Sequence, residues 1–298
     1  MKCLVAGWFS FEQMGATAGD LLAKDLVCDW LQKAGRSFDV AYAPPFSGGV
    51  SWREIDPSDY RDVVFVCGPF GNGEPVVPFL EKFAGRPLYG VNLTMLDSLA
   101  NWNPFARLWE RDSDRTIRPD ITYLTQNSRR VPVVGMILIH PQEEYGPRDQ
   151  HVVAHAAIRK LLEAREVAIV PIDTRLDENL TGLRTPSEVD SLIARMDMVV
   201  TTRLHGTVLA LKNAVPALVV DPIEGGAKIT RQVKAVGWPV LHSVESLDDE
   251  ALVRDFEFCL SDAARVQALK CRDRAIRVLG EVQQDFIGTL IKGRVLTP

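Results

Sequence analysis

Residues 198–211, with the sequence MVVTTRLHGTVLAL, combine the two kinds of element from which the chain is built. The first residues, MVVT, are apolar or β-branched without interruption, which is typical of a strand buried on both faces of a sheet. Residues 204–213 continue directly with the length and composition of a helix. A strand followed at once by a helix predicts a parallel sheet, because parallel strands need a crossover connection between them.

The same alternation runs through most of the sequence. It predicts an α/β fold with two Rossmann-like parallel-sheet domains, residues 1–130 and 131–275, whose strand ends face a shared cleft. We expect irregular structure at 92–130, between the two sheets. Strands are predicted at 2–6, 38–42, 62–67, 87–91, 133–139, 167–172, 198–202 and 217–221, and helices at 18–34, 76–83, 148–164, 187–195, 204–213 and 248–291.

Charge and composition exclude several classes of function. The 298 residues include 34 Lys and Arg against 39 Asp and Glu, a net charge of −5, which argues against nonspecific nucleic-acid binding and against a polybasic membrane surface. We expect no signal peptide, and the sequence contains no apolar run of the roughly 18–20 residues that span a bilayer. Five cysteines without a CxxC pair favour free thiols in the cytoplasm and no metal site.

An anion site is predicted where the strand at 198–202 ends. Arg203 carries a planar guanidinium that can hold phosphate or carboxylate through two hydrogen bonds. The helix that follows begins beside His205 and Gly206, and its free backbone N–H groups and dipole also favour an anion. His205 can give or take a proton near neutral pH. The alternative is that Arg203 forms a salt bridge and His205 only caps the helix.

A second loop with similar chemistry follows the strand at 217–221. Gly225 and Gly226 allow close approach of the backbone to a ligand, and Lys228 and Arg231 lie on the next helix. We expect a phosphate-contacting loop here, with an ordinary glycine turn between solvated charges as the alternative.

Other candidates lie at predicted strand ends or in the irregular middle. Gly71 and Asn72 follow the strand at 62–67, and His140 follows the strand at 133–139, so both places are expected to line the cleft. Asp20 is either a catalytic or acceptor-binding carboxylate or one that stabilises the start of a helix. Arg111 either reaches an anionic ligand or pairs with neighbouring charges.

Aromatic and histidine residues have simpler readings. Trp8, Phe9 and Phe11 would form a sugar-stacking wall or, alternatively, part of the core. The remaining histidines are expected on the surface or on helix faces, and they are His151, His155 and His242.

The segment 202–206, TRLHG, followed by Ala210 and Leu211, by VPA at 215–217 and by DP at 221–222, resembles the Arg-x-His signature of the polysaccharide pyruvyl transferase family. Further similar parts are Gly19 with Asp20, the glycine-rich turn at 68–73, and RDS at 111–113. The resemblance extends over about residues 1–239.

The resemblance implies the two-domain fold of GT-B glycosyltransferases, with residues 276–298 forming a crossover helix and tail that pack back on the first domain. It also implies an enzyme of exopolysaccharide biosynthesis that transfers the pyruvyl group of phosphoenolpyruvate to two hydroxyls of a sugar. The first domain would bind the acceptor and the second the donor. Arg203 and His205 would contact phosphoenolpyruvate, with Arg111 as a further contact.

This reaction needs no cofactor and no metal, only phosphoenolpyruvate as donor substrate and a sugar or glycan acceptor. His205 would donate the proton, and Asp20 would be the base. Two alternatives stay open: a GT-B nucleotide-sugar glycosyltransferase or epimerase, and a catalytically silent protein that binds sugar or phosphate. The oligomeric state and the acceptor sugar do not follow from the sequence.

Overall fold

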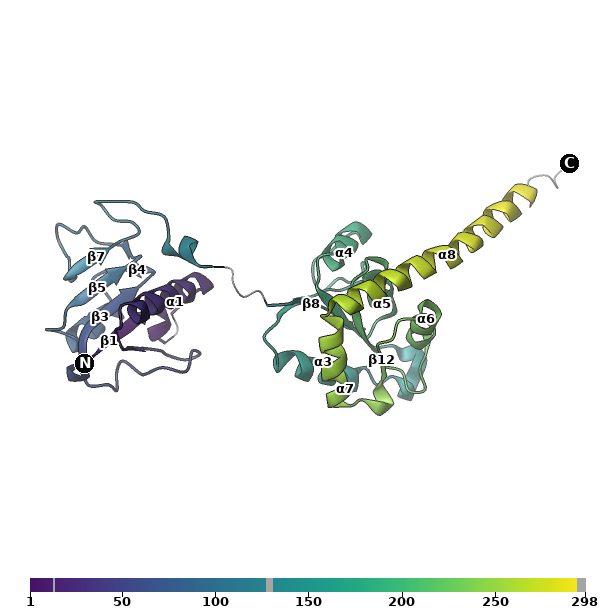
Figure 1. Ribbon diagram of the computed structural model, residues 1–298, viewed down its shortest axis with the longest axis horizontal. Helices are drawn as coiled ribbons and strands as arrows, with labels where there is room; N and C mark the ends of the chain where they lie inside the picture. The colour runs from purple at the N-terminus through teal and green to yellow at the C-terminus, as the bar shows by residue number, and fades with distance from the viewer. Residues whose placement is uncertain (13, 127–130, 294–298) are drawn as a thin grey trace. The chain divides into compact units, whose positions relative to one another are not determined.

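The computed structural model describes residues 1–12, 14–126 and 131–293 (Figure 1). The chain divides into two compact units, Met1–Ser128 (unit 1) and Arg129–Pro298 (unit 2). The end of the predicted first domain, at 127–130, and the end of the predicted tail, at 294–298, lie outside the described residues. Each unit is an α/β structure around a parallel sheet, so the predicted α/β class with two parallel-sheet domains is confirmed. The shared cleft between the domains stays a prediction.

Unit 1 contains a five-stranded parallel sheet with the order β2-β1-β3-β5-β7. Its two central strands, β1 and β3, are almost entirely buried, as the predicted apolar runs require. The strands are β1 (Lys2–Gly7), β2 (Phe38–Val40), β3 (Tyr60–Val66), β5 (Leu88–Val91) and β7 (Arg107–Trp109); β4 (Pro69–Phe70) and β6 (Thr94–Met95) form a separate pair.

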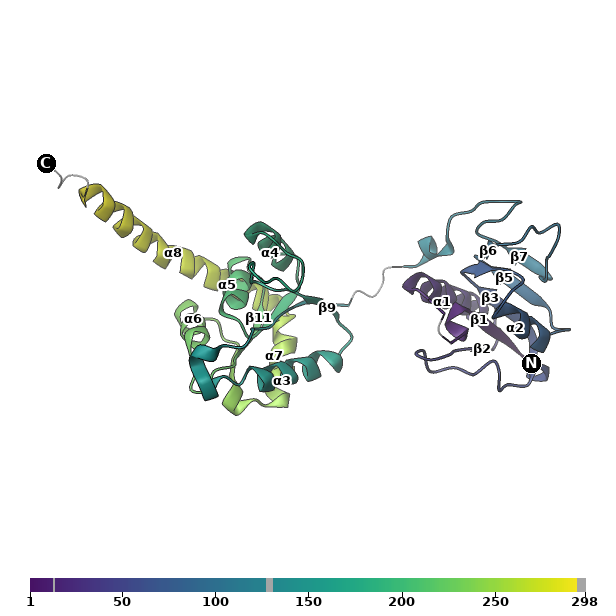
Figure 2. The ribbon, with the colours of Figure 1, turned by 180° about the vertical axis from the view of Figure 1, so that it is seen from behind.

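One helix covers each face of this sheet. Successive side chains of a strand point to opposite faces, so neighbouring residues of β3 contact different helices. Val64 on β3 packs with Val27 of α1 (Ala18–Lys33), whereas Phe65 packs with Phe79 of α2 (Val76–Lys82). Figure 2 shows α1 and α2 on either side of the strands. The two cores are therefore separate layers of one sandwich.

Unit 2 contains a second five-stranded parallel sheet, with the order β12-β11-β10-β8-β9. Its central strand β10 (Met198–Thr201) is buried along its whole length. The other strands are β8 (Val133–Ile137), β9 (Ala168–Pro171), β11 (Ala217–Asp221) and β12 (Leu241–Ser243), and the helices are α3 (His151–Glu163), α4 (Pro186–Ile193), α5 (Leu204–Lys212), α6 (Lys228–Val236), α7 (Asp249–Cys259) and α8 (Asp262–Gly293). Figure 1 shows α3 and α7 on one side of the strands and α4 and α5 on the other.

The order of the strands reverses between β8 and β10. The chain passes from β8 to β9 on one side, and then returns to place β10 on the other side of β8. In open α/β sheets, ligands usually bind outside the carboxyl ends of the strands at such a reversal. His140 follows β8 and Arg203 follows β10, so two of the predicted site residues lie at this point.

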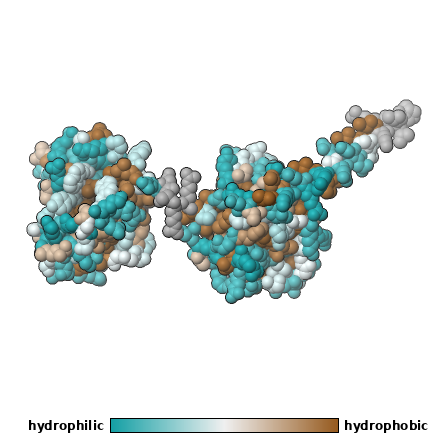
Figure 3. All heavy atoms as spheres, viewed as in Figure 1, coloured by the Kyte–Doolittle hydropathy of each residue, from teal (hydrophilic) through white to brown (hydrophobic). Residues whose placement is uncertain are grey.

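The long helix α8 packs on unit 2 only through its first part. Ala264, Ala268 and Cys271 are buried in the core of unit 2, whereas the later apolar side chains, including Ile276 and Phe286, are exposed. Figure 3 shows this part of α8 with apolar residues at its surface. The predicted packing of the helix on the first domain stays a prediction. Within the described part of the chain, no helix has the length and apolarity that crossing a bilayer requires.

All five cysteines are free thiols, and four of them are buried. Burial raises the pKa of the Cys28 and Cys67 thiols to about 11. It raises the pKa of Cys3 and Cys259 further. These side chains are therefore protonated at neutral pH and behave as small apolar groups.

The expectation of irregular structure at 92–130 is wrong in three places. Ile121–Leu124 forms a 3₁₀ helix, and β6 pairs with β4. Arg107–Trp109 forms β7, which pairs with β5 and completes the sheet of unit 1. The strand has only three residues and lies at an edge, with its side chains largely exposed, so it has neither the buried apolar run nor the alternation that reveals a strand in a sequence.

Gly206 allows α5 to approach the sheet. A Cβ atom at this position would lie 2.3 Å from the Thr201 hydroxyl oxygen and 2.9 Å from a methyl carbon of Ile137. We predict that Gly206→Ala lowers the free energy of unfolding by about 1–3 kcal/mol, because a closely packed site cannot absorb the methyl group. Urea denaturation followed by circular dichroism measures this change.

The matched control is Gly280→Ala in α8, where a Cβ would meet no atom within 4 Å. Alanine is the better helix former by roughly 0.5–1 kcal/mol, so this variant should be as stable as the wild type or slightly more stable. Equal effects of the two substitutions would contradict the packing argument.

Candidate functional site

Arg203 is held at the end of β10 by hydrogen bonds of the residue two positions earlier. The Thr201 hydroxyl oxygen accepts from the Arg203 backbone N–H at 2.9 Å, and the hydroxyl donates to the Ile137 carbonyl oxygen at 2.9 Å. Arg203 thus stands in extended conformation as the N-cap residue of α5, and its side chain begins where β8 and β10 end. The local sequence TTR therefore determines where the guanidinium starts.

The carboxylate of Asp173, just beyond β9, joins three strand ends. Asp173 is only 5% exposed. Its Oδ1 accepts from Arg203 Nη1 at 3.2 Å and from the Arg175 backbone N–H at 2.9 Å. Its Oδ2 lies 3.1 Å from His140 Nε2 and accepts from the Leu180 backbone N–H at 3.2 Å. The structure thus brings together two predicted site residues, Arg203 and His140, through an aspartate that the sequence analysis did not single out.

The charges in this cluster follow from its surroundings. Burial acts to raise the pKa of Asp173, but the amides of Arg175 and Leu180 and the His140 ring outweigh it, and the pKa of Asp173 lies below its ordinary value. Burial lowers the pKa of the Arg203 guanidinium. An arginine stays cationic in proteins even so. The cluster therefore contains an ionised carboxylate against a cation.

The Arg203 guanidinium retains capacity for a ligand. Its side chain is 17% exposed, and within the described residues its one hydrogen-bond partner is Asp173, through Nη1. A guanidinium has five N–H donors, so most of them are available to an anion. The two interpretations of Arg203 from the sequence are therefore compatible, since the residue forms a salt bridge with Asp173 and still has N–H donors for an anion.

The start of α5 adds further donors. No side chain caps this helix, and the first intrahelical bond runs from the Thr207 N–H to the Arg203 carbonyl oxygen. The N–H groups of Leu204, His205 and Gly206 precede that bond. The His205 side chain is exposed and has no hydrogen-bond or ion-pair partner within the described part of the chain, so the ring is not a cap. Gly206 is buried, and its role in the structure is close packing.

His155 lies on a helix face, as expected, and also belongs to this region. It lies on α3 with Nε2 3.2 Å from the Thr202 hydroxyl oxygen, which also accepts from the Ile139 N–H at 2.9 Å. Burial, together with His151 and Arg159, lowers the pKa of His155 to about 4, so the ring is neutral at pH 7. The signal in the sequence is the position of the predicted helix directly after the strand at 133–139, which places its first turns at the same sheet edge.

The glycine loop after β11 differs from the prediction in its backbone. Asp221, 1% exposed, accepts hydrogen bonds from the Ala227 and Thr230 N–H groups at the start of α6. The Gly225 N–H donates to Glu245 and the Gly226 N–H to the Ile223 carbonyl oxygen. The amides expected to bind phosphate are therefore already used within unit 2.

What remains of this prediction is the side chains of α6. Lys228 is partly exposed, 4.0 Å from a Glu144 carboxylate oxygen and 5.7 Å from the centre of the Tyr145 ring. Arg231 is exposed and has no ion-pair partner among the described residues. These two cations remain predicted ligand contacts.

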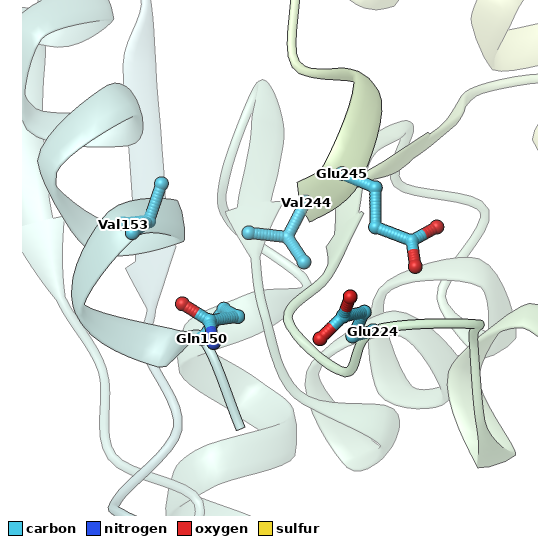
Figure 4. Close-up of a pocket in the computed structure, with 5 residues that line it drawn as sticks. All are labelled: Gln150, Val153, Glu224, Val244 and Glu245. Carbon is cyan, nitrogen blue, oxygen red and sulfur yellow. The ribbon is translucent and has the colours of Figure 1, made fainter. Parts of the chain in front are cut away.

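Unit 2 also contains a cavity of about 340 Å³, lined by Gln150, Val153, Glu224, Val244 and Glu245. Figure 4 shows Gln150 and Val153 on one side, opposite Val244 and the two glutamates. None of the predicted donor-binding residues lines it. Two carboxylates at its wall oppose the binding of a phosphate or carboxylate, so this cavity is separate from the candidate anion site.

Arg111 in unit 1 is engaged by its neighbours. It donates through Nη1 to Asp120 at 2.9 Å, through Nε to Asp112 at 3.3 Å, and through Nη2 to the Thr94 hydroxyl. The paired reading is therefore the observed one, and a ligand would have to replace these contacts. Nearby, the buried Glu110 accepts from Arg115 and Arg118.

Asp20 has the structural role that we considered as its alternative. Its Oδ2 accepts from the backbone N–H and the hydroxyl of Thr17, both at 2.7 Å, in the capping box at the start of α1. A role as base stays a prediction. Asn72 donates its backbone N–H to Asp97 at 2.8 Å, beside Gly71, and the Asn72 side chain is exposed.

The aromatic residues after β1 do not form an exposed wall. Phe9 and Phe11 are buried, and the Trp8 ring occupies the space beside Gly68, where a Cβ would lie 1.9 Å from it. The exposed indoles of unit 1 are Trp30 and Trp109, which line a cavity of about 350 Å³. The core reading of the three aromatic residues is therefore correct for Phe9 and Phe11.

The Arg111–Asp120 pair makes unit 1 sensitive to acid. Although burial opposes ionisation, the Thr122 amide, Asn92 and Arg111 lower the pKa of Asp120 to about 2. A carboxyl whose pKa is lower in the folded chain stabilises it above the ordinary value of 3.8, and this contribution is lost as the pH falls from about 4 to about 2. We predict that Asp120→Asn removes a contribution of at most about 2 kcal/mol at pH 6 and flattens the loss in this range.

Urea unfolding followed by tryptophan fluorescence measures the effect, because five of the six tryptophans lie in unit 1. The control is Asp29→Asn, at an exposed position of α1. Parallel pH profiles for wild type and Asp120→Asn would show that the pair does not act in this way.

The comparisons with known proteins cover both structure and sequence. Among solved structures, the calicheamicin glycosyltransferase CalG4 is similar at 12% identity and a TM-score of 0.36, covering 99% of this chain and 100% of its own. The UDP-GlcNAc 2-epimerase of Methanocaldococcus jannaschii has 12% identity and a TM-score of 0.33, covering 94% and 100%. MurG of Acinetobacter baumannii has 11% identity and a TM-score of 0.32, covering 95% and 100%. Similarities of this size carry no argument about the reaction.

A search of curated proteins gives no match. The family model described as polysaccharide pyruvyl transferase matches residues 116–223. The matched segment contains His140, His155, Asp173, Arg203 and His205. The resemblance of the chain to the polysaccharide pyruvyl transferase family is therefore confirmed for residues 116–223.

Proposed function

We propose that the protein is a pyruvyl transferase that moves the pyruvyl group of phosphoenolpyruvate onto two hydroxyls of a sugar in a polysaccharide or its precursor. The observation that carries the proposal is the largely buried Arg203 guanidinium, which has a single partner among the described residues and lies at the reversal of strand order in unit 2. The family match over 116–223 supports it.

The donor fits this position chemically. Phosphoenolpyruvate carries a phosphate and a carboxylate, so its site needs several cationic or N–H donors. Arg203 offers a fork of N–H groups, and the start of α5 offers backbone N–H groups with the positive end of a helix dipole. Lys228 and Arg231 are the further cations that we assign to the donor side.

His205 is our assignment for the proton donor. In the proposed reaction a proton adds to the methylene carbon of the enol, and the carbon that bears the phosphate becomes cationic. One sugar hydroxyl attacks this carbon, the C–O bond to phosphate breaks, and the second hydroxyl closes the ketal. The two hydroxyl protons replace the proton donated to the methylene and the one carried away by phosphate. His205 is exposed on the first turn of α5, where a ligand can reach it.

We assign the acceptor sugar to unit 1 and do not assign the base. Asp20, the predicted base, accepts both of its hydrogen bonds from Thr17 at the start of a helix. The two alternatives from the sequence predict different results. A nucleotide-sugar enzyme would be protected against thermal unfolding by a nucleoside diphosphate and not by phosphoenolpyruvate, whereas a silent protein would bind its ligand without releasing phosphate.

The first prediction concerns donor binding. Phosphoenolpyruvate should raise the melting temperature of the wild type, and Arg203→Ala should abolish the effect. Arg203→Lys keeps the charge but loses the planar fork, so we expect about tenfold weaker binding. Thermal melting measures the shift in melting temperature, and isothermal titration calorimetry measures the affinity for phosphoenolpyruvate.

The control variant is Arg159→Ala, an exposed arginine on α3 of the same unit. It should bind phosphoenolpyruvate as the wild type does. If saturating phosphoenolpyruvate does not shift the melting temperature of the wild type, the proposed donor is wrong.

The second prediction separates binding from chemistry. His205→Ala should leave the affinity for phosphoenolpyruvate within about threefold of wild type but lower the rate of phosphate release by about 10²–10⁴, the usual contribution of a general acid. Phosphate release with glycan acceptors measures the rate. An unchanged rate in His205→Ala would exclude His205 as the proton donor.

A further inference from the structure

We propose that Asp173 is a positioning residue of the donor site, whose carboxylate orients the Arg203 guanidinium and the His140 imidazole toward the anion. This inference rests on the proposed function for the identity of the anion. It assigns a role to a residue that the Arg-x-His motif does not contain and that lies 30 positions before Arg203 in the sequence.

The carboxylate is itself fixed before it contacts either side chain. The backbone N–H groups of Arg175 and Leu180 each donate to one of its oxygens, at 2.9 and 3.2 Å. The Asn179 side chain donates to the Asp173 carbonyl oxygen at 2.9 Å and so closes the loop after β9. A buried carboxylate held by backbone amides can transmit the position of the sheet edge to the side chains that it contacts.

The contact with Arg203 is of a kind that orients the guanidinium without occupying it. Asp173 Oδ1 accepts from Nη1 alone, at 3.2 Å, and the Nε and Nη2 donors have no partner within the described residues. A bidentate ion pair would use the face of the fork that phosphate needs. The single contact instead fixes the guanidinium at one end.

The contact with His140 acts on the ring nitrogens. Asp173 Oδ2 lies 3.1 Å from His140 Nε2. A carboxylate at this distance favours a proton on Nε2, which leaves Nδ1 as the other polar atom of the ring. Asp173 thereby holds a guanidinium and an imidazole, from the ends of β10 and β8, in one arrangement.

A carboxylate that competes with the ligand and one that positions Arg203 would change the affinity for anions in opposite directions. If Asp173 competed with the ligand for Arg203, its removal would increase the affinity for anions. If it positions Arg203, its removal decreases that affinity. Asp173→Asn keeps the shape of the side chain but replaces one acceptor oxygen with an NH₂ group, so it cannot accept from both Arg203 and His140.

We expect Asp173→Asn to weaken phosphoenolpyruvate binding by roughly 10- to 100-fold, as for other supporting residues of a preorganised site. The matched control is Asp190→Asn, a half-buried carboxylate on α4 of the same unit, which accepts from Lys212 and Asn213 but not from Arg203. It should destabilise unit 2 and leave the affinity within about threefold. Unchanged or increased affinity in Asp173→Asn, or an equal loss in Asp190→Asn, would overturn the proposal.

A double-mutant cycle tests whether Asp173 acts through Arg203. In the Arg203→Lys background, Asp173→Asn should cost much less affinity than it costs in the wild type, because the group that it positions is already replaced. Additive losses would contradict a role through Arg203.

A milder variant serves if Asp173→Asn does not fold. Leu180 is 82% exposed, and its N–H donates to Asp173. Leu180→Pro deletes this N–H and should weaken binding several-fold, whereas Leu180→Ala should not. Equal affinities of the two variants would oppose the proposal.

One measurement is independent of phosphoenolpyruvate. In spectra of ¹⁵N-arginine-labelled protein, the Arg203 Nε–H signal, identified by its loss in Arg203→Lys, should move in Asp173→Asn and stay unchanged in Asp190→Asn. If the wild type fails to bind phosphoenolpyruvate while this signal behaves as expected, the proposed function fails and the positioning role stands. If the signal does not move, the positioning role fails whatever the ligand.

Discussion

The architecture of unit 2 converges on one buried carboxylate, that of Asp173. Burying an ionised group is costly unless its hydrogen-bonding capacity is filled. Here two backbone amides, a guanidinium and an imidazole fill it, and they come from the loops after β8, β9 and β10. These loops can meet only because three adjacent strands are parallel and end at the same edge. The order of the sheet is therefore a condition for the site.

The sequence predicted the repeating elements of both units well, because their signals are local. Buried strands such as β3 and β11 have continuous apolar runs, and the helices between them have capping residues or an apolar stripe. β7 and β12 escaped prediction, because an edge strand of three residues has no such pattern. The pairing of each with its neighbour is a property of the assembled sheet and not of its own residues. The helix predicted at 248–291 is in fact two helices, α7 and α8.

The residues of the candidate site also differ in whether a local sequence signal reveals them. Arg203 and His205 could be identified because a short motif places them at a strand end. Asp173 and His155 could not, since their importance comes from contacts over 30 and 47 positions of the sequence. Gly225 and Gly226 are a case in which the sequence pattern misled. The pattern predicted backbone N–H groups that are free to bind phosphate. In the structure the Gly225 N–H donates to Glu245, and the Ala227 N–H of the same loop donates to Asp221.

The protonated cysteines of both units have a practical consequence for chemical labelling. Maleimides and iodoacetamide react with thiolates, and buried thiols with a raised pKa supply few of them at neutral pH. A single cysteine introduced at an exposed position of α5 would therefore react much faster than the native cysteines. Because the native thiols belong to the hydrophobic cores and react slowly, a fluorophore or spin label would attach mainly to the introduced cysteine near Arg203.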